Sequence, residues 1–201
     1  MSLNIIKKEL RKSIKLRLKQ VTEENVKKQS LKVTKHITSS SWFQNSKKIS
    51  IYLNMPFSEL KTEDLVKEIL LQNKQCFIPK TKGDDMRMVE IKSIQELNDL
   101  PKNNWNIPEP LDGEEGMDAV FNLENGLDLI LLPGLGFDIK CNRIGYGKGY
   151  YDKFIQQHLI KFNKKPLLVG ICLEEQICNE IPMEEYDYQL DQVVTASQIY
   201  P

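Results

Sequence analysis

Histidine and paired cysteines are scarce in this chain. Only His36 and His158 are present, and the four cysteines show no CxxC spacing and no histidine cluster nearby. A zinc site is therefore not expected. Three of the four cysteines lie in or beside apolar segments, where a thiol most often acts as a small buried hydrophobe. We expect reduced thiols instead of a disulfide framework, and a cytoplasmic location.

The chain also lacks an excess of charge and a long apolar run. Its 28 lysines and arginines balance 28 aspartates and glutamates, which is not typical of a protein that binds nucleic acid. The longest apolar run, Leu127–Leu132 with Asp128 inside it, is far shorter than the roughly 20 residues of a membrane-spanning helix. Charged residues at positions 7–12 disfavour a secretory signal, and Glu9 disfavours a transit peptide. We expect no membrane and no nucleic-acid partner.

The N-terminal part of the sequence is predicted to be helical. Apolar residues recur every four positions over Ile6–Leu18, and Lys7 and Arg11 share an adjacent face. Thr22, followed by two glutamates, is typical of the cap of a second helix. The length of 201 residues fits a single domain over 1–201 that begins with this helical segment.

After the helical segment, β-rich runs alternate with helical spacing. A helix capped by Thr62 and a helix from Tyr150 onward separate some of these runs. The alternation predicts an α/β fold with a mostly parallel sheet and helices on both faces. In such sheets ligands bind at the carboxyl ends of the strands. The expected strands are Ile49–Leu53, Cys76–Ile78 before Pro79, Met88–Ile91, Leu127–Leu132 and Leu167–Leu173, and Pro101–Gly116 is expected to be a loop.

A glycine-rich stretch, PGLGFDIKCNRIGYGKGYYD over Pro133–Asp152, directly follows one buried strand. Its glycines allow backbone amides to approach an anion, Arg143 and Lys148 add positive charge, and a helix N-terminus follows. The strand, loop, cations and helix in this order favour a phosphate site over an incidental surface turn. Tyr150 excludes a Rossmann motif, and Gly149 excludes a Walker loop. Asp152, in the first helical turn, is placed to hold Mg²⁺ or to interact with the helix dipole.

Several segments, in order along the chain, resemble the 5-formyltetrahydrofolate cyclo-ligase family, also called methenyltetrahydrofolate synthetases. Ordered, spaced matches are more specific than any single motif. The matching segments are KKELR at Lys7–Arg11, ISIYL at Ile49–Leu53, ELKTE from Glu59, WNIPEP at Trp105–Pro110, LDLILLPGLGFD at Leu127–Asp138, NRIGYGKGYYD at Asn142–Asp152, EEQIC at Glu174–Cys178, and the final Asp187 and Asp191.

The resemblance implies a monomeric enzyme that depends on ATP and Mg²⁺ and acts on a folate. It would close the N5-formyl group of 5-formyltetrahydrofolate onto N10, giving 5,10-methenyltetrahydrofolate, ADP and phosphate. Because an amide oxygen leaves poorly, transfer of the γ-phosphoryl group to the formyl oxygen would first activate it. The attacking nucleophile is N10 of the substrate, so the protein would position groups and stabilise charge.

The resemblance also implies roles for individual residues. Arg143 and Lys148 would be catalytic, Asp152 and Asp187 would hold Mg²⁺, and Leu53 and Glu59 would contact the folate. Lys7 and Arg11 lie one helical turn apart, whereas Lys8 and Lys12 point elsewhere on the helix. The implied ATP-binding residues are Lys7, Lys8, Glu9, Leu10, Arg11, Arg143, Ile144, Gly145, Tyr146, Gly147, Lys148, Gly149, Tyr150 and Tyr151, and the folate would also contact Tyr146, Gly147, Lys148, Gly149 and Tyr150.

The chain departs from the family pattern in two places. The spacing from Leu53 to Glu59 is one residue longer than in close relatives, and Tyr146 stands where some members carry arginine. Trp105 is expected either to wall the pocket or to be buried in the core.

Two other functions compete with this interpretation. An acyl- or CoA-transferase, or a sugar-phosphate isomerase relative, would share the architecture but would need a catalytic carboxylate and no ATP. An RNA-binding module could use the basic first helix, but the zero net charge disfavours it.

Overall fold

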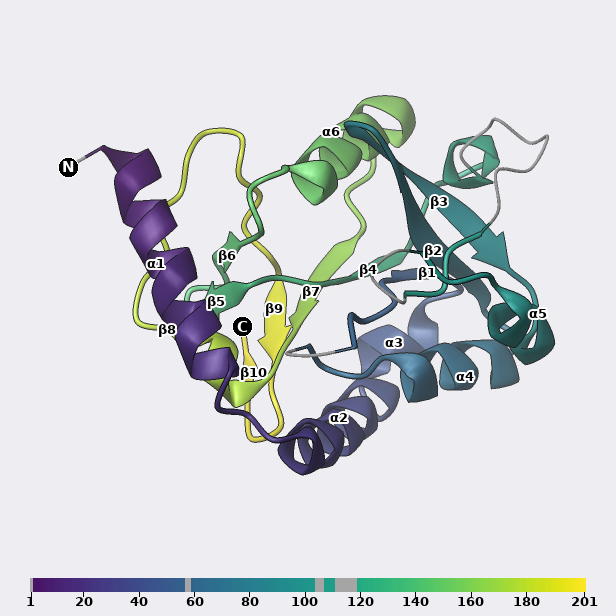
Figure 1. The fold of residues 1–201 in the computed structure, drawn as a ribbon. Helices are drawn as coiled ribbons and strands as arrows, with labels where there is room; N and C mark the ends of the chain where they lie inside the picture. Colours follow the sequence, from purple (N-terminus) through teal and green to yellow (C-terminus); the bar gives the residue numbers. More distant parts are fainter. Residues whose placement is uncertain (1, 57–58, 104–106, 111–118) are drawn as a thin grey trace.

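The computed structural model describes residues 2–56, 59–103, 107–110 and 119–201. Its main feature is a seven-stranded sheet in the order β10-β9-β7-β4-β1-β2-β3 (Figure 1). The inner pairs are parallel, and the edge strands β3 and β10 pair antiparallel. This confirms the predicted mostly parallel α/β fold. The strands are β1 Lys48–Ile51, β2 Gln75–Lys82, β3 Asp85–Ile91, β4 Leu129–Leu132, β7 Leu167–Ile171, β9 Gln192–Val194 and β10 Ile199–Tyr200.

Hydrophobic cores cover both faces of this sheet. In β4 all four residues are buried, Leu129 and Leu131 in one core and Ile130 and Leu132 in the other. Successive side chains of a strand point to opposite faces, so a continuous apolar run is what a doubly covered strand requires.

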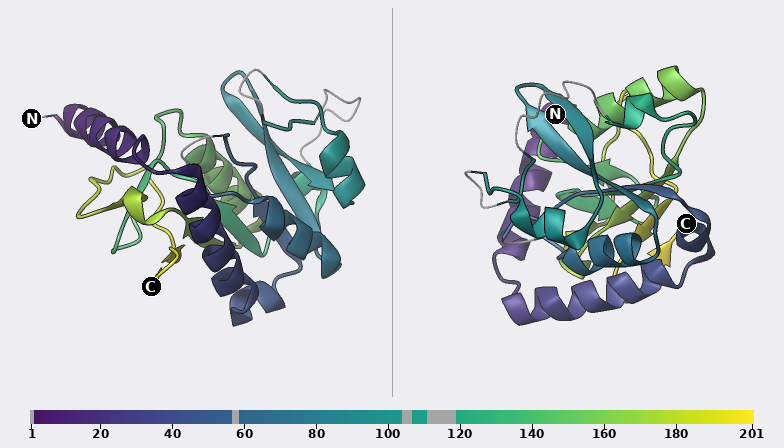
Figure 2. Two further views of the ribbon diagram at one scale, coloured as in Figure 1. Left: turned by 60° about the horizontal axis from the view of Figure 1, so that its bottom comes forward. Right: turned by 90° about the vertical axis from the view of Figure 1, so that its right-hand side faces the viewer.

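Each core is formed between one face of the sheet and the helices that pack against it. One core contains buried residues of α1 (Leu3–Leu18), α2 (Glu23–Thr38), α3 (Ser41–Asn45) and α4 (Glu63–Leu71), and the other contains those of α6 (Tyr150–Phe162). Figures 1 and 2 place α1 at one end of the molecule and the β2–β3 hairpin at the other, with β6 and the start of α6 between them. The remaining helical segments are α5 Ile94–Asp99, η1 Ala119–Asn122 and η2 Glu174–Gln176.

A second, three-stranded sheet in the order β6-β5-β8 was not predicted. Its strands are β5 Gly136–Asp138, β6 Arg143–Ile144 and β8 Ile177–Cys178, too short to show a hydrophobic period. Asp138 is fully buried, and its carboxylate accepts hydrogen bonds from the backbone amides of Lys140, Asn142 and Ile181 at 2.9 Å each. This carboxylate fixes the turn between β5 and β6, inside the glycine-rich stretch.

Two local predictions need correction. β2 continues through Pro79 to Lys82, because β1 pairs with β2 only as far as Phe77, and proline is tolerated where one edge of a strand is free. Thr62 occupies the N-cap position of α4 but makes no side-chain cap; its hydroxyl donates to the carbonyl of Tyr52 at 2.8 Å. Trp105 lies outside the described residues, as does part of the expected loop Pro101–Gly116.

All four cysteines are free, as expected. All four are also buried, including Cys141, which the sequence did not place in an apolar segment. Among the described residues, no helix combines the length and the apolar character needed to span a bilayer.

Candidate active site

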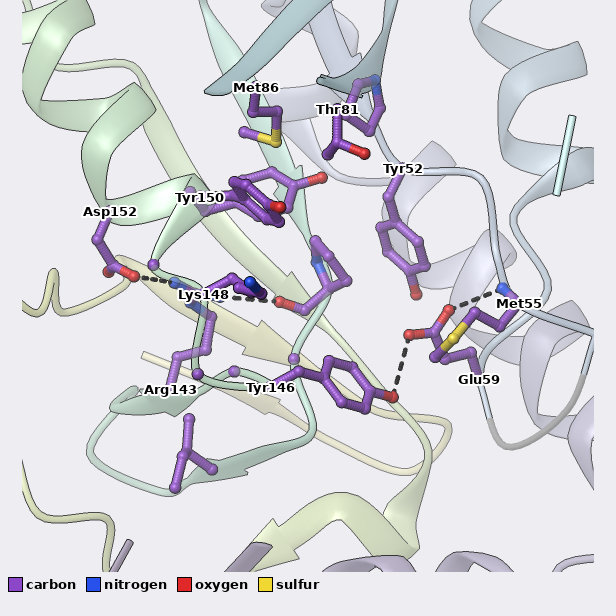
Figure 3. Close-up of a pocket in the computed structure, with 18 of the residues that line it drawn as sticks. Tyr52, Met55, Glu59, Thr81, Met86, Arg143, Tyr146, Lys148, Tyr150 and Asp152 are labelled. Carbon is purple, nitrogen blue, oxygen red and sulfur yellow. Dashed lines mark hydrogen bonds and ion pairs between the residues drawn. The ribbon is translucent and has the colours of Figure 1, made fainter. Parts of the chain in front are cut away.

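A cavity of about 640 Å³ opens where β1 and β4 end (Figure 3). Its wall comes from α1, the segment after β1, the β2–β3 hairpin, residues 103 and 107–109, the glycine-rich stretch after β4, and the segment around residues 184–187. The cavity therefore lies at the carboxyl ends of the parallel strands, where the sequence pattern predicted the ligand site.

The part of the glycine-rich stretch between β6 and α6, residues 145–149, lines the cavity. Gly147 has a φ of 105° and Gly149 a φ of 68°, values that L side chains rarely adopt. Gly149 is also the residue that precedes α6, so the stretch leads directly into a helix N-terminus. Residues 146–149 are exposed at the cavity. Open amides beside a helix N-terminus form an environment suited to an anion.

Arg143 and Asp152 form a largely buried ion pair in this wall, with 2.8 Å between Nη2 and Oδ2. The Arg143 guanidinium also lies 5.7 Å from the ring centre of Tyr151. Lys148 lines the same cavity with an exposed side chain. The stretch thus carries one cation fixed by a carboxylate and one cation open to the solvent.

Lys7 reaches the cavity from α1 and lies between two carboxylates. Its Nζ is 2.6 Å from both Glu184 Oε2 and Asp187 Oδ2, and the residue is only 6% exposed. Burial acts to lower the pKa of Lys7, but the hydrogen bonds to Asp187 and Glu184 outweigh it, so the pKa is raised. Lys7 is therefore held as a cation.

Arg11 follows Lys7 by one helical turn and lines the same cavity. Its Nε donates to the carbonyl of Gly145 at 2.9 Å, which joins α1 to the glycine-rich stretch. The other residues of this segment are not among those that line the cavity: Lys8 and Glu9 are exposed, and Leu10 packs against the core. Helical geometry separates these two groups because residues four apart share a face.

Glu59 lies on the opposite side of the cavity and is 7% exposed. Its Oε2 accepts a hydrogen bond from the Met55 amide at 2.9 Å, and its Oε1 accepts one from the Tyr146 hydroxyl at 3.5 Å (Figure 3). Burial raises the pKa of Glu59 to about 7, although these two hydrogen bonds act in the other direction. Leu53 also lines the cavity.

Three tyrosines also line the cavity, namely Tyr52, Tyr146 and Tyr151. Burial, reinforced by the charge of Glu59, raises the pKa of both Tyr52 and Tyr146. Burial also raises the pKa of Tyr151, whose hydroxyl is buried and has no hydrogen-bond partner in the described part of the chain. All three phenols stay protonated at neutral pH.

Asp152 and Asp187, the two carboxylates predicted to hold Mg²⁺, both line the cavity. Each is engaged by a cation, Asp152 by Arg143 and Asp187 by Lys7. The described residues contain no group of three or more His, Cys, Asp or Glu side chains placed to hold a metal ion on their own.

Sequence reasoning missed several residues that line the cavity. Tyr52 stands in the segment ISIYL but looked like part of a buried strand, and Glu184 and Tyr186 lie near Asp187 without a motif of their own. Thr81 and Met86 belong to the β2–β3 hairpin, beyond the expected end at Pro79. The only signal for Glu184 was its position three residues before Asp187.

Comparisons with known proteins give a consistent result. The sequence model of the 5-formyltetrahydrofolate cyclo-ligase family matches residues 4–196. A 5-formyltetrahydrofolate cyclo-ligase of Mus musculus is 40% identical over 195 residues, which cover 96% of this chain and 95% of that protein. A Caenorhabditis elegans protein named "Probable 5-formyltetrahydrofolate cyclo-ligase" is 37% identical over 193 residues, covering 94% and 92%. The NMR structure of Aquifex aeolicus 5,10-methenyltetrahydrofolate synthetase has a TM-score of 0.73 and 30% identity, covering 96% of this chain and 91% of that chain.

Proposed function

The chain belongs to the 5-formyltetrahydrofolate cyclo-ligase family, and on that premise we propose that this ligase converts 5-formyltetrahydrofolate to 5,10-methenyltetrahydrofolate, with ATP giving ADP and phosphate. One observation carries the proposal. A single cavity has a buried carboxylate, Glu59, on one side and a cationic glycine-rich stretch on the other. The first suits the hydrogen-bond donors of a pterin ring, and the second suits a polyphosphate.

The reaction needs no nucleophile from the protein. The formyl oxygen must become a leaving group before N10 can close the ring, and phosphorylation of that oxygen achieves this. N10 then attacks the formyl carbon and loses its proton to solvent, and the C–O bond breaks as the oxygen departs as part of phosphate. The enzyme has to bring the γ-phosphoryl group and the formyl oxygen together and to stabilise the charge that moves between them.

Glu59 and Leu53 are assigned to the folate end of the cavity. As a carboxylate, Glu59 can accept hydrogen bonds from the 2-amino group and the ring N–H of the pterin, two donors on adjacent positions. Its burial supports this role, because a desolvated carboxylate forms stronger interactions than an exposed one. Tyr146, which donates to Glu59 in this structure, links the folate end to the glycine-rich stretch.

The phosphate end is assigned to the amides and cations of the glycine-rich stretch and α1. Arg143 and Lys148 would stabilise charge on the transferred phosphoryl group. Lys7 and Arg11 would bind the remaining phosphates, and the contact of Arg11 with the Gly145 carbonyl supports a position beside the stretch. Lys7 is paired with Glu184 and Asp187 in this structure. A phosphate would therefore either replace these carboxylates as the partner of Lys7 or bind Lys7 beside them.

Asp152 and Asp187 are proposed to hold Mg²⁺. In nucleotide sites this ion binds through one or two carboxylates together with substrate phosphates, so two carboxylates beside a phosphate stretch fit its chemistry. In both residues Oδ2 carries the ion pair with the neighbouring cation. Oδ1 of Asp152 also accepts a hydrogen bond from the Tyr188 amide at 3.4 Å, so a metal would bind this oxygen through its second lone pair. When bound, the ion would neutralise phosphate charge.

We further propose that the enzyme is a monomer in a reducing compartment such as the cytoplasm. The four free, buried thiols support that compartment.

The mechanism can be tested with ¹⁸O in the formyl group of the substrate. Because the phosphorylated oxygen leaves with phosphate, we expect the label in inorganic phosphate after a single turnover, as measured by mass spectrometry. Release of the label into water, with unlabelled phosphate, would contradict phosphoryl transfer to the formyl oxygen.

A further inference from the structure

Tyr52 points its hydroxyl into the cavity (Figure 3). The residue directly follows β1, is 4% exposed and lines the cavity. Figure 3 shows its ring descending into the cavity with the hydroxyl toward Glu59. Among the residues that the structure describes, none forms a hydrogen bond with this hydroxyl. The hydroxyl opens into the cavity, so water or a bound ligand can accept its hydrogen bond there.

The backbone around Tyr52 is held firmly, so its hydroxyl has a defined position. The Thr62 hydroxyl donates to the Tyr52 carbonyl at 2.8 Å, and the Thr62 amide donates to Asn54 Oδ1 at 3.1 Å. These contacts tie the segment after β1 to the start of α4. The ring of Tyr52 packs in the core with the helices of that face. A phenol fixed in this way provides a pre-organised donor.

The chemistry of Tyr52 complements that of Glu59. The phenol keeps its proton, because burial and the nearby carboxylate raise its pKa, whereas the Glu59 carboxylate only accepts hydrogen bonds. A pterin ring presents donors, the 2-amino group and a ring N–H, directly beside an acceptor, the 4-oxo oxygen. The N5-formyl oxygen is a second acceptor close to the 4-oxo group. One acceptor and one donor side by side on the protein therefore match this edge of the substrate.

We propose that Tyr52 is a specificity-determining residue that donates a hydrogen bond to a carbonyl oxygen of the folate substrate, either the 4-oxo or the N5-formyl oxygen, beside the donors that Glu59 accepts. This inference rests on the proposed function, since it deepens the assignment of the folate end. It adds a second phenolic donor beside Glu59, whose carboxylate already accepts a hydrogen bond from Tyr146.

The test compares ligand affinities of the wild type, Tyr52→Phe and a control, Tyr200→Phe, by titration calorimetry. Tyr52→Phe keeps the ring and its packing, and Tyr200→Phe removes a phenolic hydroxyl outside the cavity. Loss of one hydrogen bond that leaves a carbonyl oxygen unpaired should weaken 5-formyltetrahydrofolate binding about five- to thirtyfold. ATP affinity and the melting temperature should not change, and Tyr200→Phe should match the wild type.

Tetrahydrofolate, which lacks the formyl group but keeps the 4-oxo group, separates the two acceptors. Equal weakening for both folates identifies the 4-oxo oxygen, and weakening for 5-formyltetrahydrofolate alone identifies the formyl oxygen. Unchanged folate affinity in Tyr52→Phe, or an equal loss of ATP affinity, would overturn the inference while the proposed function stands. A wild type that binds neither folate would instead overturn the proposed function together with this inference.

Discussion

The Tyr146 hydroxyl donates a hydrogen bond to Oε1 of Glu59 across the cavity, at 3.5 Å. The two residues are 87 positions apart in the sequence and belong to the two halves of the proposed site. Tyr146 lies in the glycine-rich stretch assigned to phosphate, and Glu59 is the carboxylate assigned to the pterin. A folate that binds Glu59 would compete with Tyr146 for the carboxylate. Folate binding at the pterin half of the site would therefore affect the glycine-rich stretch at the phosphate half.

Folate affinity should fall as the pH falls through neutrality. Glu59 accepts hydrogen bonds from the pterin as a carboxylate, and its pKa of about 7 means that protonation removes an acceptor below that pH. Between pH 8 and pH 6 the ionised fraction falls about tenfold, so the Kd for 5-formyltetrahydrofolate should rise by about that factor. Titrations at the two pH values measure it. Glu59→Gln should bind weakly at both, and an equally steep pH dependence in this variant would exclude Glu59 as the source.

Replacing Lys7 by methionine should weaken ATP binding more than folate binding. The change removes a buried cation and leaves Glu184 and Asp187 without their shared partner, which adds repulsion toward phosphate. A charged hydrogen bond contributes about 1.5–3 kcal/mol, so the Kd for ATP should rise about tenfold or more. Lys12→Met is the matched control, because Lys12 is an exposed lysine of the same helix. Equal ATP affinities in the two variants would show that Lys7 does not bind the phosphates.

Asp152→Asn and Asp187→Asn should each abolish Mg²⁺-dependent turnover while the protein stays folded. A neutral amide keeps the size of the side chain but is a weaker ligand for a hard cation. Titration of Mg²⁺ into the ATP-bound protein should show weaker binding in both variants. Asp64→Asn is the control, since Asp64 is also in the first turn of a helix but lies outside the cavity. Normal Mg²⁺ dependence in Asp152→Asn would mean that this carboxylate serves only as the partner of Arg143.

Arg143→Met and Lys148→Met should differ in stability although both lower the rate. Removing one charge-stabilising contact typically lowers kcat about a hundredfold, and both variants should show this in steady-state kinetics. Arg143→Met also leaves the largely buried carboxylate of Asp152 unpaired, so only this variant should have a lower melting temperature. Lys148 is exposed, and its loss should leave the melting temperature unchanged. If both variants turn over normally, the stretch binds phosphate through its backbone alone.

The sequence predicted the parts of the fold that carry a hydrophobic period. β4, with four buried residues, and α1, with apolar positions every fourth residue, stand where the patterns indicated. The second sheet was missed because strands of two or three residues carry no period. Thr62 shows a different limit. It is a residue typical of a helix cap, but its hydroxyl donates instead to the carbonyl of Tyr52, just after β1, because this tertiary contact was available.

The cavity itself could be predicted only in part. The resemblance indicated Lys7 and Arg11, and helical spacing placed them on one face, which the structure turns toward the glycine-rich stretch. It could not show that Glu184 lies against Lys7, since 177 positions separate them. Tyr52 was missed for the same reason, because the exposure of a side chain at the end of a strand depends on segments distant in the sequence.

The most direct measurement is the absorbance of the methenyl product when purified protein is mixed with 5-formyltetrahydrofolate, ATP and Mg²⁺. The account predicts that the methenyl chromophore forms only when ATP is present, with one ADP released for each product molecule. Formation of the chromophore without nucleotide, or none at saturating ATP and Mg²⁺, would contradict it.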